Sequence, residues 1–429
     1  MHPGRKVSVL GLGKSGVQGA LFLKKRGYEV FASESADHES ARGQAEMLRS
    51  QGVEAETGTH SAERILTSDW VLISPGISPK TPIYQTLLRA AKPVFSEIEV
   101  ASWFCQSKRI LAVTGSSGKT TVATLLARVL EASGAPTLCC GNIGNPWIGE
   151  LERIVPETSV VLEISSFQLQ QCFSFRPHTA ILLNISPNHL DWHRDMKDYA
   201  GAKFRIFQNQ RPGDFAFLRR EDMENFFPEF KSEAEVCYFD LDLTGNPNEG
   251  VIRKVAARLG IRSDAVDRVL ADFSGLEHRL ERVAEFGGVT FVNDSKATTT
   301  AALAWALEKY ADRSVCLIAG GIAKSADYHT IRELIRRKVR KVCLMGDAAP
   351  VLEAAWGGAA PIYRADNLAD ALSEACAAAG SSGTVLLSPA CSSFDMFKNY
   401  QERGRIFKEL VQARISGKSR AEAPSGVGS

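Results

Sequence analysis

The sequence lacks the features that would place the chain in a membrane or hold it together with disulfides. Its nine cysteines include no C-x-x-C pair and are scattered, apart from Cys139 and Cys140. This pattern favours free thiols in a reducing compartment over a disulfide framework or a zinc site. No apolar run approaches the length of a membrane span. Only the short apolar run 7–12 follows the basic start, so no signal peptide is predicted and a cytoplasmic location is expected.

A strong charge imbalance is also missing. The formal net charge is +2 at pH 7, which gives no argument for a nucleic acid or a membrane surface as partner. With 44% hydrophobic and 23% charged residues the composition is that of an ordinary globular protein, and 429 residues allow two to four domains. The tail from Ser416 is small and polar and is expected to be disordered.

The stretch 110–121 has the pattern of a phosphate-binding loop. Residues 110–113 predict a short buried strand, 114–118 a glycine-containing turn, and 122–130 a helix with apolar residues at helical spacing. Backbone N–H groups and the positive end of the helix dipole would face phosphates. Lys119 would reach the β/γ-phosphates and the Thr120 hydroxyl would bind Mg²⁺. The candidate nucleotide-binding residues are Gly115, Ser116, Ser117, Gly118, Lys119, Thr120 and Thr121.

This loop departs from the usual G-x-x-x-x-G-K-[ST] pattern. Val113 stands in the place of the first glycine, and the first glycine present is Gly115. The alternative is a chance Gly-Lys-Thr turn, which the strand before it and the helix after it disfavour.

Residues 1–105 have the order of a nucleotide-binding unit. A strand at 6–10, the glycine turn 11–16, a helix at 17–25 and a strand at 29–32 lead to Ser33-Glu34. This is the order of a dinucleotide fingerprint, but it leaves open whether the ligand is NAD or another diphosphate.

A second polar loop follows the next predicted strand of this unit. The strand at 70–73 runs into the Pro/Gly-rich loop 74–79, in the place where ligands bind in open α/β sheets, although a plain turn would look the same. A helix at 81–91 and a strand at 93–95 come next, and 102–109 reads as a linker.

The second predicted unit, 106–303, places further polar residues after strands. Glu163 lies near the end of a strand at 159–164, and a buried carboxylate beside a phosphate loop would have Mg²⁺ as its obvious partner. His189 follows a strand at 179–185, and Lys203 lies on a helix at 196–207. Taken alone, His189 reads as an ordinary polar loop residue and Lys203 as a solvated helix residue.

The third predicted unit, 304–429, is again built of alternating strands and helices. Residues 211–285 look peripheral, and the helix at 299–310 would cross into the third unit. The fold class is therefore α/β with three domains: a Rossmann-like domain at 1–105, a central P-loop domain with a mainly parallel sheet at 106–303, and a Rossmann-like domain at 304–429.

Seven segments of the chain resemble the Mur ligases of bacterial peptidoglycan synthesis. The resemblance covers residues 5–411, and the last segment favours the D-glutamate-adding member, while the Asp-Asn-Pro-Arg signature of the diaminopimelate-adding member is missing. The segments are 114–121, 141–144, 162–169, 188–191, 275–279, 293–298 and 387–400.

The resemblance implies an ATP-dependent ligase. ATP would phosphorylate the carboxylate of UDP-N-acetylmuramoyl-L-alanine, and the amine of D-glutamate would attack the acyl-phosphate to give the amide, ADP and phosphate. Phosphorylation makes chemical sense because a carboxylate is a poor electrophile without a leaving group. The partners would be these small molecules with ATP and Mg²⁺, and the protein would be a monomer.

The resemblance also implies residue roles. Lys119, Glu163, His189 and Lys203 would form the catalytic centre, with Thr120, Glu163, His189 and a carbamylated Lys203 as metal ligands. His278, Arg279 and Asn293 would lie near the nucleotide. The residues that would hold the UDP-substrate are Lys14, Ser15, Ser33, Glu34, Ser74, Pro75, Gly76 and Asn142, and those for D-glutamate are Lys324, Ser393, Phe394 and Tyr400.

Three positions depart from the family's pattern. Ser116-Ser117 replaces the common Thr-Asn, Glu277 replaces a proline, and Ile322 stands where relatives often have an acid that could meet the ribose. The competing interpretations are a folylpolyglutamate synthase-type ligase, which residues 1–105 disfavour, another Mur ligase, an NAD-dependent oxidoreductase and a non-enzymatic nucleotide-binding module.

Overall fold

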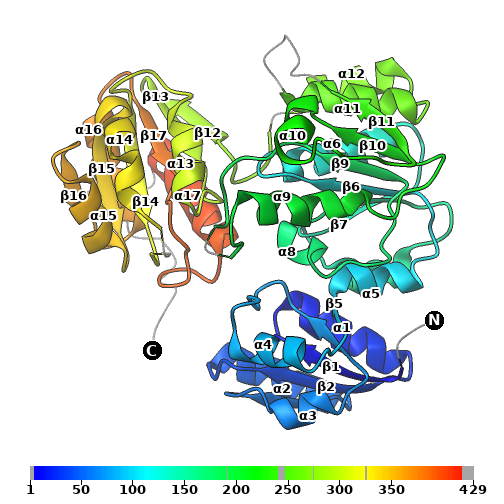
Figure 1. Ribbon diagram of the computed structural model, residues 1–429. Coiled ribbons are helices and arrows are strands. Elements are labelled where there is room, and N and C mark those ends of the chain that lie inside the picture. Colours follow the sequence, from blue (N-terminus) through cyan, green and yellow to red (C-terminus); the bar gives the residue numbers. More distant parts are fainter. Residues whose placement is uncertain (1–3, 191, 240–246, 274, 324–325, 418–429) are drawn as a thin grey trace. The chain divides into compact units, whose positions relative to one another are not determined.

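The computed structural model describes residues 4–190, 192–239, 247–273, 275–323 and 326–417 (Figure 1). The chain divides into two compact units, Met1–Phe273 and Ser274–Ser429, and the described residues form three sheets. The first two sheets belong to the first unit. The predicted α/β class is confirmed. Among the described residues, no helix is long and apolar enough to cross a membrane.

The first sheet has five parallel strands in the order β3-β2-β1-β4-β5. Its strands are β1 (Lys6–Leu10), β2 (Glu29–Glu34), β3 (Glu54–Thr57), β4 (Trp70–Ile73) and β5 (Val94–Ser96). Its helices are α1 (Lys14–Lys25), α2 (Glu39–Ser50), α3 (Ala62–Leu66), α4 (Pro82–Arg89) and α5 (Glu97–Phe104).

Side chains alternate across this sheet, as the strand period requires. Val7 and Val9 of β1 pack with α1 and α2 on one face, whereas Leu10 packs on the other face with α3 and α4. Both faces are therefore covered, as in doubly wound folds. Helix α5 occupies residues that the sequence analysis assigned partly to a linker from Ser102, so the linker shortens to 105–109.

The second sheet has six parallel strands in the order β11-β10-β9-β6-β8-β7. Its strands are β6 (Ile110–Thr114), β7 (Thr137–Gly141), β8 (Ser159–Glu163), β9 (Thr179–Leu182), β10 (Phe215–Leu218) and β11 (Glu235–Tyr238). The helices of this part are α6 (Lys119–Ala132), α7 (Trp147–Glu150), α8 (Ser166–Leu169), α9 (Met196–Phe204), α10 (Arg220–Phe226), α11 (Pro247–Arg258) and α12 (Ser263–Ala271).

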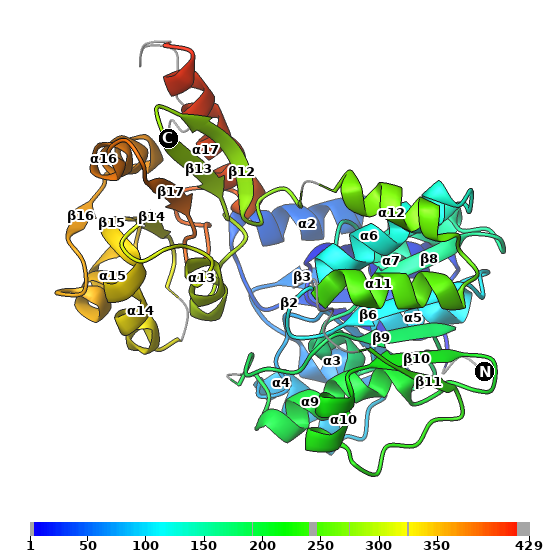
Figure 2. The same ribbon diagram turned by 90° about the horizontal axis from the view of Figure 1, so that it is seen from above.

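The prediction that residues 211–285 are peripheral is wrong, because two strands and two helices of this segment belong to the second sheet and its cover. β10 and β11 complete one edge of the second sheet, because β10 pairs with β9 and β11 pairs with β10. Helices α11 and α12 pack beside α6 over one face of the sheet (Figure 2). The opposite face shares a continuous apolar core with the first sheet, which explains why both sheets form one unit.

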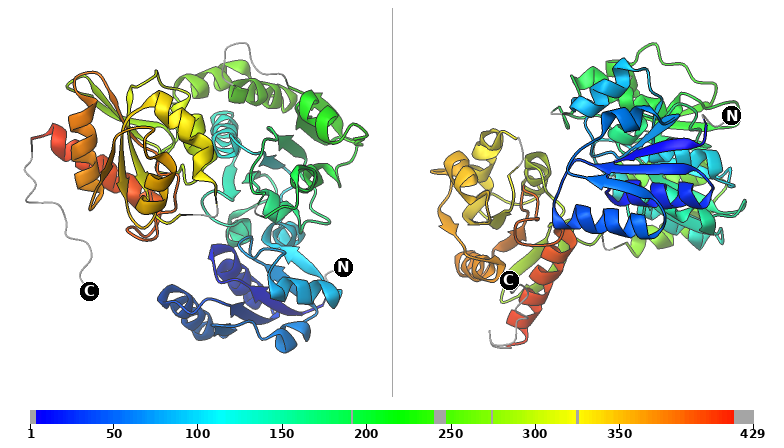
Figure 3. Two further views of the ribbon diagram at one scale, coloured as in Figure 1. Left: turned by 60° about the vertical axis from the view of Figure 1, so that its left-hand side comes forward. Right: turned by 90° about the horizontal axis from the view of Figure 1, so that it is seen from below.

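The second unit contains the third sheet, in the order β12-β13-β17-β14-β15-β16, with only β12 antiparallel to its neighbour. Its strands are β12 (Glu281–Phe286), β13 (Val289–Asn293), β14 (Val315–Gly320), β15 (Val339–Met345), β16 (Ile362–Arg364) and β17 (Thr384–Leu387). Its helices are α13 (Thr300–Leu307), α14 (Arg332–Lys338), α15 (Ala349–Trp356), α16 (Leu368–Ala379) and α17 (Tyr400–Ile415), and they lie on both sides of the sheet (Figure 3).

The third sheet places the division of the chain earlier than the sequence analysis did. β13 pairs with β17, with Thr290 opposite Thr384, so β12 and β13 belong to the second unit. The predicted boundary at residue 303 therefore differs from the observed division near residue 274. The predicted disordered tail lies outside the described residues from 418 onward.

Candidate active site

The loop between β6 and α6 has the backbone shape that a phosphate site needs. Gly118 caps α6 with φ 81° and Gly115 has φ 152°, both in the region that favours glycine. The backbone N–H groups of Ser116 and Ser117 donate to the carbonyl and side-chain oxygens of Asn184, each at 2.9 Å. The loop is thus fixed from the neighbouring strand end before any ligand arrives.

Two lysine side chains meet at one carbonyl of this loop. Lys119 Nζ donates to Gly115 O at 2.9 Å and Lys203 Nζ donates to the same oxygen at 2.8 Å. Lys203 is 1% exposed, and its Nζ lies 4.6 Å from the ring centre of Tyr199. Burial, followed by the charge of Lys119, holds the pKa of Lys203 well below its usual value, against the opposing effect of Glu163.

Glu163 ends β8 with a carboxylate that is only half satisfied. Asn142 Nδ2 donates to its Oε1 at 2.8 Å, whereas Oε2 is buried and has no hydrogen-bond partner in the described part of the chain. A buried carboxylate oxygen without a partner is costly, and a divalent cation is a natural ligand for it. With the nearly buried hydroxyl of Thr120 at the start of α6, these residues fit a magnesium ion.

His189 adopts a left-handed backbone conformation, with φ 56°. Such a conformation is uncommon outside glycine and is found at functional sites. Its ring packs against Phe167, with ring centres 4.8 Å apart, and near Tyr199 at 6.3 Å. Tyr199 also contacts Lys203, and its hydroxyl lies 3.0 Å from that of Ser116, so one ring lies near His189, Lys203 and the phosphate loop.

The first sheet carries a separate cavity of about 760 Å³ at the carboxyl ends of its strands. Six of the eight residues predicted to hold the UDP-substrate line this cavity: Lys14, Ser15, Glu34, Ser74, Pro75 and Gly76. Ser33 does not line it, because its hydroxyl is fully buried against Glu56 and His60. Asn142 lies on the second sheet beside Glu163.

The second unit brings together three of its predicted residues. Asn293 Nδ2 lies 2.9 Å from His278 Nδ1, and the ring of Tyr400 lies 5.9 Å from that of His278. Arg279 follows His278 in the turn that precedes β12. Ser393 is buried, while Phe394 is 70% exposed. The predicted Lys324 lies outside the described residues.

Sequence reasoning missed several residues that shape these sites. Thr59 and His60 line the cavity of the first sheet, but they follow a short charged strand that carries no apolar pattern. Arg403 on α17 is fully buried and donates to Ser295 O at 2.9 Å and to Cys391 O at 3.3 Å, so it ties two loops together. Burial lowers the pKa of Arg403 to about 10. Nothing in the sequence distinguishes Arg403 from a surface arginine.

Three family profiles match successive parts of the chain. They are described as the MurD-like N-terminal domain of Mur ligases over residues 5–96, the Mur ligase middle domain over 113–255 and the Mur ligase glutamate ligase domain over 278–391.

Full-length relatives agree with these profiles. The UDP-N-acetylmuramoylalanine–D-glutamate ligases of Salinibacter ruber and Chloroherpeton thalassium are 39% and 36% identical to the chain. The alignments cover 96% and 95% of this chain and 98% of each relative.

Solved structures share the fold at lower identity. The UDP-N-acetylmuramate-alanine ligase MurC from Thermotoga maritima has a TM-score of 0.57 at 16% identity and covers 95% of this chain and 99% of its own. The MurF ligase from the same organism, solved with ADP, has a TM-score of 0.58 at 14% identity and covers 83% of this chain and 92% of its own. With three matching domain profiles in order and full-length relatives above 30% identity, the chain belongs to the Mur ligase family.

Proposed function

We propose that the protein joins D-glutamate to UDP-N-acetylmuramoyl-L-alanine with the hydrolysis of ATP to ADP and phosphate. The observation that carries this proposal is the cluster around Gly115, in which two lysines and the half-satisfied Glu163 surround a preformed phosphate loop. The two relatives described above, at 36% and 39% identity, are named as ligases that catalyse this reaction.

The phosphate loop would hold the triphosphate, and Lys119 would exchange the Gly115 carbonyl for phosphate oxygens. The substrate carboxylate would attack the terminal phosphorus and ADP would leave. The amine of D-glutamate would then attack the acyl carbon, phosphate would leave, and the nitrogen would lose a proton to give the amide. The backbone N–H groups at the start of α6 and the Lys119 side chain would stabilise charge on the transferring phosphoryl group.

Magnesium would supply charge neutralisation at the phosphates. Glu163 Oε2 and the Thr120 hydroxyl would hold one ion, and His189 would hold a second. Asn142 would keep Glu163 oriented through its bond to Oε1, in the way that hydrogen-bonded neighbours orient metal ligands.

Lys203 would act as a carbamate. Its neutral amine would add to carbon dioxide, forming an N–C bond and releasing one proton, and the product would be an anionic oxygen ligand. Its burial beside Lys119 and Glu163 supports this role, because a charged ammonium is costly there. An unmodified helix lysine would be expected at the surface instead.

Each of the three sheets would bind one of the three ligands. Residues 1–105 would bind the UDP portion of the substrate, the second sheet would bind ATP, and the third would bind D-glutamate through Lys324, Ser393, Phe394 and Tyr400. His278, Arg279 and Asn293 would approach the nucleotide. The protein would act in the cytoplasm as a monomer.

Amino-acid-dependent phosphate release tests this function. With ATP, Mg²⁺ and UDP-N-acetylmuramoyl-L-alanine present, D-glutamate should start phosphate release, whereas L-glutamate, L-alanine and diaminopimelate should not. Release with one of these three, and none with D-glutamate, would reassign the amino-acid specificity.

Binding of UDP separates this function from that of a dehydrogenase. Calorimetry should detect UDP binding to the protein and no NAD binding, because the glycine turn after β1 is paired with the 74–76 loop in one cavity. Binding of NAD without a response to UDP would favour the oxidoreductase interpretation.

A further inference from the structure

The cavity of the first sheet has two chemically different ends. At one end lie Gly11, Gly13, Lys14 and Ser15, at the start of α1, where backbone N–H groups and a lysine suit a diphosphate. At the other end lie residues that follow β2 and β3, including Glu34, Thr59 and His60. In this fold the acid after the second strand meets the ribose, here Glu34, and the lining continues from Glu34 to Thr59 and His60, so the base beyond the ribose would lie toward His60.

His60 is held at one ring nitrogen by a buried network. Its Nδ1 lies 2.7 Å from Ser33 Oγ, and Ser33 is fully buried. Ser33 Oγ also donates to Glu56 Oε1 at 2.7 Å. Glu56 in turn accepts from the backbone N–H of Ser61 at 2.8 Å and from its hydroxyl at 2.5 Å. The ring is therefore fixed in orientation, with Nδ1 facing into the protein.

Proton counting assigns the tautomer of this ring. Ser33 has one hydroxyl proton, which it donates to Glu56 Oε1 at 2.7 Å, with the carbonyl of Thr59 as a more distant acceptor at 3.3 Å. Nδ1 of His60 must then be the donor to Ser33 Oγ. In a neutral imidazole with Nδ1 protonated, Nε2 carries a lone pair and is an acceptor.

Nε2 is available for a ligand. Within the described part of the chain it has no hydrogen-bond partner, and His60 lines the cavity. Burial lowers the pKa of His60, more strongly than the nearby Glu34 and Glu56 raise it, which is consistent with a neutral ring. The Glu34 carboxylate is a poorer acceptor for a ligand N–H group than His60 Nε2. Its two oxygens already accept from the backbone N–H groups of Leu12 and Ala36 at 2.9 and 3.1 Å.

We propose that His60 is a specificity-determining residue whose Nε2 accepts a hydrogen bond from the N3–H group of a uracil base. This inference rests on the proposed function, since it concerns the nucleotide portion of the same substrate. Uracil presents a donor at N3, whereas cytosine presents a lone pair there, which would face the lone pair of Nε2. The network beneath the ring would thus select uridine over cytidine diphosphates.

The test compares three probes by calorimetry on the full chain: UDP, CDP and N3-methyl-UDP. The unaltered protein should bind UDP about tenfold more tightly than the other two, the size expected for one hydrogen bond between neutral groups. His60→Ala should bind UDP and CDP with equal affinity, within about twofold. His329→Ala, which removes an exposed histidine of the second unit, should keep the full preference.

A structural role alone would not move the ratio of UDP to CDP affinity. If His60→Ala binds UDP and keeps the tenfold preference, the assignment of His60 is overturned while the proposed function stands. If the unaltered chain does not bind UDP, the substrate class fails and both proposals fall. Nitrogen-15 NMR gives an independent reading: His60 should be protonated at Nδ1 and not at Nε2, and the opposite tautomer would refute the network argument.

Discussion

At the scale of single residues, the molecule buries ionisable groups where a ligand or a neighbouring element can use them. Lys203 and Glu163 are 1% and 2% exposed, and both lie next to the phosphate loop. Glu97 is equally buried, but it lies away from this loop, against the start of α7, where its Oε1 accepts from the backbone N–H of Ile148 at 2.6 Å. These residues give separate predictions because the first two lie beside the phosphate loop and the third faces a packed interior.

Lys203→Ala should lower D-glutamate-dependent phosphate release by at least about 100-fold, because it removes the side chain that we propose as an anionic metal ligand. Lys203→Arg should fail as well, since a guanidinium cannot form a carbamate and keeps the wrong charge. A short carboxylic acid such as acetate should partly restore the Ala variant and not the Arg variant. Near-normal release by either variant in the absence of added acid would show that Lys203 is an ordinary buried lysine.

Glu97→Gln should make stability less dependent on pH. Burial raises the pKa of Glu97 to about 7, against the hydrogen bonds from Ile148 and Trp147. Between pH 4.5 and 7 the unfolded chain therefore loses a proton that the folded protein keeps, so the unaltered protein loses stability as pH rises. Urea unfolding should show Glu97→Gln gaining about 3 kcal/mol relative to the unaltered protein from pH 4.5 to pH 8. A pH-independent difference would place the Glu97 pKa near its ordinary value.

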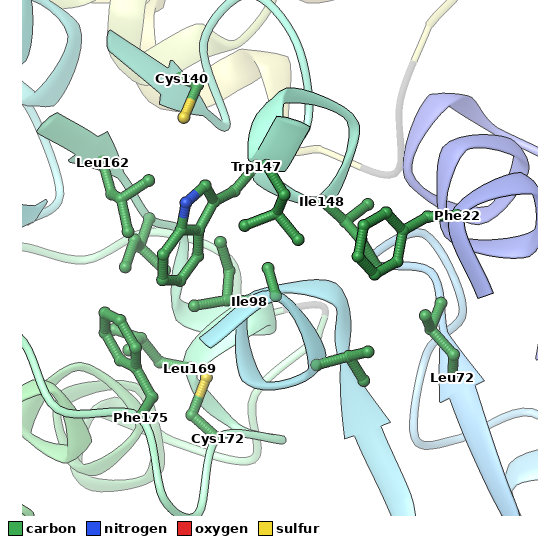
Figure 4. Close-up of a cluster of buried hydrophobic side chains, with 14 of the residues drawn as sticks. Phe22, Leu72, Ile98, Cys140, Trp147, Ile148, Leu162, Leu169, Cys172 and Phe175 are labelled. Atoms are coloured by element: carbon green, nitrogen blue, oxygen red, sulfur yellow. The ribbon is translucent and has the colours of Figure 1, made fainter. Parts of the chain in front are cut away.

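At the scale of elements, helix α5 joins the first two sheets through its side chains. Glu99 accepts from the backbone N–H groups of Phe173, Ser174 and Phe175, each at about 2.9 to 3.0 Å. Ile98 lies among apolar side chains of both sheets, between Trp147 and Leu72 (Figure 4). One turn of helix thus satisfies a loop of the second sheet and fills the core that both sheets share.

Glu99→Ala should destabilise the first unit by about 2–3 kcal/mol, because it leaves the buried N–H group of Phe175 and the partly buried N–H groups of Phe173 and Ser174 without their acceptor. The denaturant midpoint of a probe in the first unit measures this loss. Glu46→Ala on α2 removes an exposed glutamate and should leave the midpoint unchanged. If both variants shift the midpoint equally, the 173–175 loop does not depend on Glu99.

Gly404→Ala on α17 should weaken the second unit although alanine favours helices. An added Cβ would lie 2.2 Å from His278 Nδ1 and 3.0 Å from Asn293 Nδ2, so the helix or the His278 turn must move. Overpacking of this kind costs about 1–3 kcal/mol. Gly43→Ala on α2 has no atom within 4 Å and should instead stabilise by up to about 1 kcal/mol. Thermal unfolding distinguishes the two, and a stabilising Gly404→Ala would show that His278 is free to move.

The sequence predicted elements well where pattern and loop chemistry agreed. The strands at 6–10 and 70–73 have the bounds that their sequence patterns predicted. Helix α5 was missed in part because Glu97 and Glu99 look like surface residues, although both are buried by partners distant in the sequence. The predicted boundary at residue 303 put β13 in the second predicted unit, because its pairing with β17 spans more than 90 residues, which no local pattern reveals.

The residues of the candidate site also differ in how far the sequence predicted them. The phosphate loop was predicted from contiguous residues, and the grouping of Glu163 and Lys203 beside it came from the family resemblance. The roles of Ser33 and His60 could not be predicted, since they depend on a side-chain network between β2 and the end of β3.

At the scale of the whole molecule, the two units have separate apolar cores. The first unit contains the clusters around β1, β6 and α6, and the second contains those on either face of the third sheet. A fragment with its own core can fold alone. We therefore expect each unit to fold independently of the other.

Fragments 1–273 and 274–417 should each fold when produced separately. Circular dichroism should show a cooperative thermal transition for both, and UDP should raise the transition temperature of the first fragment only, because its cavity lies on the first sheet. Absence of a cooperative transition in either fragment would show that its core is completed by the other unit.

The contacts of helix α5 also determine at which residue two related ligases can be recombined into a folded chimaera with the first domain of one and the remainder of the other. Its apolar contacts, such as Phe104 with Phe22 at 5.2 Å, tolerate substitution, whereas the Glu97 and Glu99 bonds to the 148 and 173–175 backbone demand fixed geometry. A crossover at residue 105 would separate these glutamates from the loops that they satisfy. A crossover at residue 96, where the N-terminal family profile ends, would inherit them together. Chimaeras joined at residue 96 should therefore be recovered as folded proteins more often than those joined at residue 105.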